Sequence, residues 1–447
     1  MVFGMIRRQI IFVMFVTAII MGCNKQSTLD RSLDLAGDNR HELESVLNHY
    51  SDNTEKFAAA HFLIDNLPAH YSYAGAEIHE YYDYAARILA DTALTPEQQR
   101  DSLLFITDAK YADLPNHTIP DAQIITADFL IDNIDKSYTQ WTTCPWASHI
   151  TFSEYLEWML PYKLVEFQEL DHWRDTMYTL FGASALERRI PNDVEYNNVI
   201  HVADTVRYMT SSCMPQHRLS THGCLSLLSD YLQVHQTFGR SEDYSLTLAL
   251  LLRSIGVPVM LDETPVGPRY SASTRWIVTL SERGEELCSE WDFSTVIGNG
   301  FFPYERGPKV YRNTYATNMD RQKYMRKSKY KYPFDLTVQD VTSHYFLTSD
   351  ICIPVNGKVR EPYVYIASAV RDDDNPWTIV DFAPLKHGKA CFHDMGREVL
   401  YTVMGYNGKE PVPVTAPFIL HKDGTMEYVN ADTIQSTNLD KWKNYAL

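Results

Sequence analysis

The stretch that decides the fold runs from Gly239 to Asp292 and reads GRSEDYSLTLALLLRSIGVPVMLDETPVGPRYSASTRWIVTLSERGEELCSEWD. Ser241 stands where a helix can begin, because its hydroxyl can accept a bond from a free backbone N–H of the first turn. The leucines between Leu246 and Leu252 cover most of the helix circumference, which predicts burial on nearly all sides. Gly256 can close the helix in the left-handed conformation. Three strands are expected next, at Val257–Asp262, Ser273–Leu280 and Glu286–Phe293, with a hairpin at Gly284.

This arrangement resembles the transglutaminase-like, papain-related superfamily, in which a catalytic Cys begins a buried helix and a His-x-Trp strand and an Asp follow. The matching residues here are Gly239, Glu242, Asp243, the run Leu251–Pro258, Trp276 and Asp292. The resemblance implies a small helical cluster set against an antiparallel sheet. It also implies that the Cys, His and Asp positions are held here by Ser241, Thr274 and Asp292.

These substitutions predict a site without catalysis. A serine hydroxyl needs a general base within hydrogen-bond reach, and Thr274 cannot supply one. Asp292 then has no imidazole to orient. One alternative is an active cysteine or serine amidohydrolase or protease, in which His222 or His235 reaches Ser241, or in which Cys224 is a relocated nucleophile. Another alternative is a scaffold whose tyrosine-rich surfaces dock partner proteins.

The N-terminus resembles a bacterial lipoprotein signal. Arg7 and Arg8 precede an apolar run from Ile10 to Met21, and Gly22-Cys23 follows. The resemblance implies a signal peptide at 1–22, lipidation of Cys23, and a polar tether over 23–40. We therefore expect a lipid-anchored protein of the cell envelope, periplasmic or surface-exposed. Disulfides are permitted in that compartment, and the candidate pair is Cys213 with Cys224.

The remaining pattern predicts an α+β protein of three regions. Residues 41–185 carry helical periodicity, with helices at His41–Tyr50, Asn53–Asn66, Thr126–Ser137, Thr151–Tyr162 and Tyr162–Leu180, and another that opens at Thr95. Residues 186–335 form the transglutaminase-like core. Residues 336–447 are expected to form a β-sandwich with strands at Phe346–Ile353, Tyr363–Ser368, Trp377–Phe382, Glu398–Met404 and Val412–Leu420.

Charge and composition limit the partners. A net charge of −17 argues against nucleic acid or anionic membrane as the main partner, so membrane contact is expected through the lipid anchor only. The basic stretch Lys309–Tyr332 is expected to be solvated, with binding of an anionic polymer as the alternative. His387, Cys391 and His393 lack a fourth ligand, so neither a metal nor a cofactor is expected. The expected partner is a peptide, protein or glycan ligand at the cell envelope.

Overall fold

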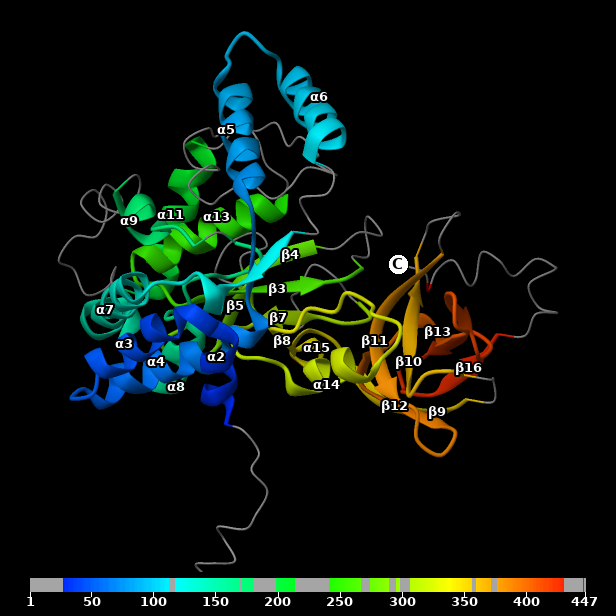
Figure 1. The fold of residues 1–447 in the computed structure, drawn as a ribbon. Helices are drawn as coiled ribbons and strands as arrows, with labels where there is room; N and C mark the ends of the chain where they lie inside the picture. The colour runs from blue at the N-terminus through cyan, green and yellow to red at the C-terminus, as the bar shows by residue number, and fades with distance from the viewer. Residues whose placement is uncertain are drawn as a thin grey trace, which may run out of the picture.

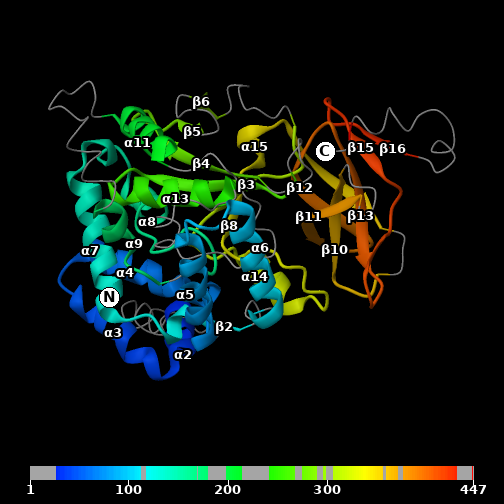
Figure 2. The same ribbon diagram turned by 90° about the horizontal axis from the view of Figure 1, so that it is seen from above.

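The computed structural model confirms an α+β fold (Figures 1 and 2). It describes residues 27–111, 117–168, 170–179, 198–213, 241–266, 274–288, 295–297, 306–355, 359–370, 376–429 and 445. Within these residues, no helix combines the length and apolarity needed to cross a membrane.

The N-terminal region is helical, as its periodicity predicts. Its helices are α2 (Thr28–Ala36), α3 (Arg40–His49), α4 (Thr54–Asn66), α5 (Ala76–Ala90), α6 (Pro96–Ile106), α7 (Ala127–Thr143), α8 (Phe152–Trp158) and α9 (Trp173–Met177). The strands β1 (Tyr71–Tyr73) and β2 (Thr118–Pro120) pair between them. Capping boxes open α6 at Thr95 and α8 at Thr151. Helices α5 and α6 project from the body as a hairpin (Figure 1).

Two expectations for this region are wrong. The tether predicted over 23–40 contains α2, which Ser27 begins with a capping box to Asp30 and which buries Leu33. The helix predicted over Tyr162–Leu180 is replaced by an irregular segment and the short α9. The segment leaves helical geometry because its polar side chains make tertiary contacts. The Nζ of Lys163, for example, donates to the backbone oxygen of Tyr71 at 3.1 Å.

A six-stranded antiparallel sheet forms the centre of the molecule. Its order is β6-β5-β4-β3-β7-β8, and its strands are β3 (Val259–Thr264), β4 (Thr274–Leu280), β5 (Glu286–Cys288), β6 (Thr295–Val296), β7 (Tyr311–Asn313) and β8 (Val338–Asp340). One face packs against α13 (Ser241–Ser254) and α11 (Val199–Cys213), where Leu261 and Ile277 join the helix leucines. The other face, with Met260, Trp276 and Val278, packs against the N-terminal helices.

The buried helix predicted from the leucine run is α13. Leu248, Leu250 and Leu252 are all buried. Gly256 closes the helix at φ 85°, in the left-handed region. A Cβ at this position would lie 2.7 Å from the Sγ of Cys144, so the close approach of α7 also requires glycine. The hairpin glycine Gly284 has φ 74°, as a tight turn between β4 and β5 requires.

The C-terminal region consists of two antiparallel sheets that share one apolar core. The larger sheet has the order β11-β10-β13-β15-β16 with β14 on β13, and the smaller one pairs β12 with β9. The strands are β9 (Thr348–Pro354), β10 (Tyr363–Ala369), β11 (Trp377–Pro384), β12 (Lys389–Gly396), β13 (Val399–Tyr406), β14 (Pro411–Pro413), β15 (Phe418–Leu420) and β16 (Met426–Tyr428). Two sheets around one core agree with the predicted β-sandwich.

Two details of this region differ from the prediction. The strand predicted at Val412–Leu420 is divided into β14 and β15, and β12 was not predicted. Cys391 of β12 lies directly opposite Cys352 of β9, and the two form a disulfide. Cys391 is therefore unavailable as a metal ligand beside His387 and His393. The disulfide between Cys352 and Cys391 was not predicted, and the predicted pair, Cys213 with Cys224, extends outside the described residues.

The central sheet and the C-terminal region are joined through Lys309. Its side chain is fully buried, and its Nζ hydrogen-bonds to a carboxylate oxygen of Asp340 and lies 3.4 Å from Asp381 Oδ2. Nζ also donates to the backbone oxygen of His393 at 2.6 Å. Helices α14 (Met319–Lys327) and α15 (Thr342–Tyr345) lie at the same junction (Figure 1).

Candidate functional site

The N-terminal end of α13 meets the beginning of β4, where the resemblance places the substituted active site. The Oγ of Ser245 lies 3.3 Å from the backbone oxygen of Arg275, and Ser241 lies one turn before Ser245. The side chain of Ser241 lies outside the described residues. So do Asp292, His222, Cys224 and His235, and also Cys23, the predicted lipidation site.

The alternation of side chains along β4 determines on which face of the sheet Thr274 lies. Trp276 and Ile277 pack in the cores on opposite faces of the sheet, and Ile277 is the one that faces α13. Thr274 shares the face of Trp276, because successive side chains of a strand alternate. Arg275 therefore lies on the face of α13 at this end of the strand, whereas the resemblance implies that position 274 should face the helix.

Two other cysteines of the described region have free thiols, Cys144 and Cys288. Burial raises the pKa of the Cys144 thiol to about 11, so it is protonated at neutral pH. The thiol points at the backbone oxygen of Ile255 at 3.7 Å. Cys288 is fully buried in the core below Trp276. These environments are those of structural cysteines rather than of nucleophiles.

A pocket of about 260 Å³ opens on the sheet face on which α13 packs, and we call it the polar pocket. The segment after α8 forms one wall, and the ends of β4, β7 and the approach to β8 form the others. Its lining residues are His70, Lys163, Leu164, Val165, Glu166, Phe167, Arg275, Asn313, Thr314, Asp335 and Thr337. It brings together five ionisable side chains from segments far apart in the sequence.

Hydrogen bonds fix the first wall of the polar pocket. Nδ1 of His70 lies 3.3 Å from Glu166 and its Nε2 lies 3.0 Å from the backbone oxygen of Tyr315. The Nζ of Lys163 lies 2.5 Å from the fully buried Asp121 and donates to the backbone oxygen of Tyr71 at 3.1 Å. Burial alone would raise the pKa of Glu166, but the bond from His70 and the charge of Lys163 hold it below its usual value.

One residue of the same wall has a strained backbone conformation. Phe167 has φ 61°, which is costly for a bulky residue. Its ring stacks on Tyr73 with centroids 5.1 Å apart, and this packing helps to hold the unusual conformation. Strained backbone is concentrated at functional sites, where it holds side chains in place.

The opposite wall carries the carboxylate of Asp335 and the guanidinium of Arg275. Arg275 donates to Glu263 from Nε at 3.1 Å and from Nη2 at 2.7 Å, so this pair is largely neutralised. Asp335 keeps solvent-accessible surface toward the pocket. Desolvation by the surrounding protein raises its pKa to about 6 and the charge of Glu263 adds to this shift, while the charges of Arg321 and Arg275 oppose it. Among the described residues, none donates a hydrogen bond to the Asp335 carboxylate.

A larger hollow of about 690 Å³ lies between α11 and the β4–β5 hairpin. Its acidic side chains already serve the local structure. Glu282 accepts a bond from the backbone N–H of Val199 at 2.7 Å, and Asp204 pairs with Arg207 at 3.3 Å. The polar pocket is the stronger candidate because fixed charged groups from several segments surround one exposed carboxylate, that of Asp335.

Sequence reasoning missed the polar pocket. The sequence pattern points to Ser241, Thr274 and Asp292, and the periodicity over 162–180 predicts one helix. A local signal was present in Lys163 and Glu166, which follow Pro161-Tyr162 and bring two charges into an otherwise apolar segment. The partners of these two charges come from 42 to 96 residues away, because Lys163 pairs with Asp121 and Glu166 with His70. No spacing rule could have identified them.

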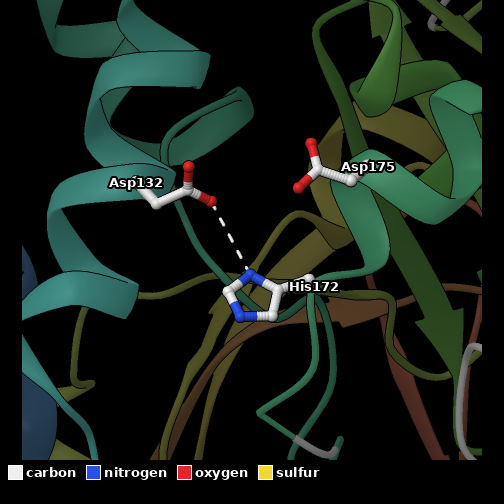
Figure 3. Close-up of side chains that lie close together, drawn as sticks. All are labelled: Asp132, His172 and Asp175. Carbon is white, nitrogen blue, oxygen red and sulfur yellow. Dashed lines mark ion pairs between the residues drawn. The ribbon is translucent and has the colours of Figure 1, made fainter.

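A second cluster, Asp132, His172 and Asp175, has the ligand types of a metal site (Figure 3). The ammonium of Lys136 already lies 2.7 Å from Asp132 and 2.5 Å from Asp175. Burial would lower the pKa of Lys136, but these two carboxylates raise it. The lysine thus supplies the positive charge that the acidic groups require, and the cluster is best explained as an ion-pair network between α7 and α9.

No family model, curated protein or solved structure matches this chain. The assignment of its function therefore depends on the chemistry of the site.

Proposed function

We propose that this protein is a lipid-anchored envelope protein that binds, without catalysis, a peptide through its protonated amino terminus in the polar pocket. The observation that carries the proposal is the carboxylate of Asp335, which is exposed to the pocket and accepts no hydrogen bond from a described residue. An ammonium group placed there would make charge-assisted hydrogen bonds with it.

The pocket dimensions support a terminal group rather than an enclosed ligand. Its volume of about 260 Å³ is below the ~300–1,000 Å³ of pockets that enclose whole drug-sized ligands. Asn313, Thr314 and Thr337 add uncharged polar groups beside Asp335. Such groups can pair with the first peptide unit, while the rest of the chain stays outside.

The absence of catalysis is supported by residue chemistry. Thr274 cannot act as a general base, and strand alternation turns it away from α13. In the polar pocket, both nitrogens of His70 are engaged by Glu166 and Tyr315. A binding role requires neither a nucleophile nor a base.

Calorimetric titration with trialanine and its N-acetylated form tests the proposal. We expect binding of the free amine only. The substitution Asp335→Asn should weaken binding by about 10–100-fold, since a hydrogen bond to a charged group is worth ~1.5–3 kcal/mol. The matched control Asp320→Asn alters an exposed carboxylate at the start of α14 and should bind as the parent does.

The pH dependence of trialanine binding is a second test of the same site. Because the pKa of Asp335 is about 6, affinity should rise about tenfold from pH 5 to pH 7 in the parent and should stay flat in Asp335→Asn. Equal binding of the two forms of trialanine would refute the amine site. Binding of glucosamine in preference to trialanine would show that the pocket binds an amino sugar rather than a peptide.

Anchorage through Cys23 is a separate part of the proposal. The disulfide between Cys352 and Cys391 supports an oxidising compartment. Replacing Cys23 with Ser should release the protein from the membrane fraction of expressing cells. Continued retention of that variant would count against the lipid anchor but would leave the peptide-binding proposal intact.

A further inference from the structure

Five basic side chains form one exposed surface on α14 and the turn that follows it, and we call it the basic face. Its members are Lys323, Arg326, Lys327, Lys329 and Lys331, and all five are exposed. The only ion-pair partner expected from a neighbouring turn of α14 is Asp320, near the start of the helix. The local charge is therefore strongly positive in a chain whose net charge is −17.

Buried side chains fix α14 and the turn that carries the basic face. Tyr324 is fully buried and donates from its hydroxyl to the backbone oxygen of Tyr330 at 2.8 Å. The carboxylate of Glu361 accepts bonds from the backbone N–H groups of Lys329 at 3.0 Å and Tyr330 at 2.5 Å. Glu361 is itself buried, so it fixes the turn without covering the basic side chains.

Hydrogen bonds through α4 connect the segment just before α14 to α2, the first helix of the described chain. The backbone N–H of Thr317, just before α14, donates to Asn66 at the end of α4 at 2.8 Å. The neighbouring Asp65 accepts at 3.4 Å through its backbone oxygen from Ser32 in α2. Figure 1 shows α2 and α14 along the lower side of the molecule, with α14 nearer the C-terminal sheets.

Covalent geometry then limits the distance to an anchor at Cys23. Ser27 caps α2, and four residue steps separate it from Cys23. At ~3.3–3.6 Å per residue, an extended chain of this length spans at most ~14 Å. A lipid attached to Cys23 would therefore hold α2 and its surroundings close to the bilayer surface.

We propose that the basic face docks on anionic lipid headgroups of the membrane that carries the anchor. This inference rests on the proposed anchorage through Cys23. Basic residues near an anionic bilayer bind it by long-range attraction that fades within a Debye length of ~8–10 Å, so the local surface matters more than the net charge. The exposed Asp30 and Asp34 of α2 are repelled by the same surface, which turns α14 rather than α2 toward the headgroups.

Vesicle sedimentation tests the basic face without the anchor. The probe is the chain from Asn24 onward, which contains every described residue, with vesicles of phosphatidylglycerol mixed with phosphatidylcholine or of phosphatidylcholine alone. We expect binding to the anionic vesicles only, and loss of this binding at high salt. The triple variant Lys323→Gln, Lys327→Gln, Lys329→Gln should bind about 100-fold more weakly, from ~1 kcal/mol per basic residue.

The matched control removes three exposed lysines of the C-terminal region, Lys386, Lys389 and Lys409, by the same change to Gln. It should bind as the parent does, and near-ultraviolet circular dichroism should be the same for all three proteins. Equal loss in both variants, equal binding to both kinds of vesicle, or binding to an anionic polysaccharide but not to vesicles would overturn the inference. These outcomes are independent of trialanine binding and of the cell fractionation of Cys23→Ser.

Discussion

At the scale of single residues, the polar pocket contains a carboxylate whose environment opposes its ionisation. Asp335 is the clearest case, because burial and Glu263 oppose its ionisation. In the folded protein the carboxylate is harder to ionise than in the unfolded chain, so its charge destabilises the fold. Binding sites commonly retain such a cost, because it is recovered when the partner charge binds.

This environment predicts that Asp335→Asn stabilises the protein in a pH-dependent way. The folded pKa of about 6 lies above the ordinary value of 3.8, so the destabilisation is absent below about pH 4 and complete above about pH 6. Because the side chain is partly exposed, we expect a gain of only about 1 kcal/mol at pH 7.5. Urea unfolding at pH 4 and pH 7.5 measures it. An equal effect of the substitution at both pH values would contradict the prediction.

At the scale of elements, the central sheet is fixed by a buried ion network. Arg312 of β7 donates two bonds of 2.8 Å to the fully buried Asp262 of β3 and also pairs with Glu286 of β5. Tyr345 of α15 donates to Asp262 at 2.6 Å, and the guanidinium lies over the ring of Trp158. The pair of Arg312 and Asp262 thus connects the sheet to α8 through Trp158 and to α15 through Tyr345.

We expect Arg312→Met to destabilise the protein by about 3–5 kcal/mol, because it leaves the buried Asp262 without its countercharge. Urea unfolding at pH 7 measures the loss. The control Arg40→Met removes an exposed pair with Glu44 and should cost less than about 0.5 kcal/mol. Similar effects for both substitutions would show that burial of the network contributes nothing.

The same network predicts a response to acid. Burial would raise the pKa of Glu286, but His344 and Arg312 lower it to about 2. Because the folded pKa is below the ordinary value of 4.5, the stabilisation is present above about pH 4.5 and is lost as the pH falls toward 2. The variant Glu286→Gln should therefore lose this part of the acid sensitivity in unfolding measured from pH 6 to pH 3, while an unchanged profile would exclude Glu286 as its source.

The alternation of β4 makes the substituted active site testable. A thiol introduced by Ser241→Cys should have the same pKa with and without Thr274→His, because residue 274 lies on the face away from α13. The pH profile of alkylation measures this pKa. A thiol pKa lowered by the added histidine would show instead that the two positions face each other, as the resemblance implies.

At the scale of the whole molecule, the disulfide between Cys352 and Cys391 closes the smaller C-terminal sheet. The two cysteines are separated by 39 residues, and a bridge of this loop length stabilises by about 2–4 kcal/mol. The double substitution to Ser should accelerate amide hydrogen exchange in β9 and β12 more than in the central sheet. Unchanged exchange in both strands would mean that the bridge contributes nothing to this sheet.

The sequence predicts local features well and distant contacts poorly. The buried helix of the leucine run, the closing glycine Gly256 and the helix start at Thr95 are confirmed because each depends on neighbours in the chain. Conversely, α2 begins within the expected tether, and the predicted helix from Tyr162 is replaced by a wall of the polar pocket. The pairing of Lys163 with Asp121 is decided by tertiary packing, which no periodicity records.

The buried ammonium of Lys309 limits how the C-terminal sheets can be moved into another protein. Its partners Asp381 and His393 belong to those sheets, whereas Lys309 and Asp340 belong to the segments that bound the central sheet. A Cβ at Gly396 would lie 1.8 Å from the backbone oxygen of Gly307, so the two surfaces also meet backbone to backbone. A cut between them would separate the Lys309 ammonium from Asp381 and His393 and leave it with Asp340 alone. A fusion protein that takes only one half loses these contacts, so the residues on both sides of the junction should be kept together.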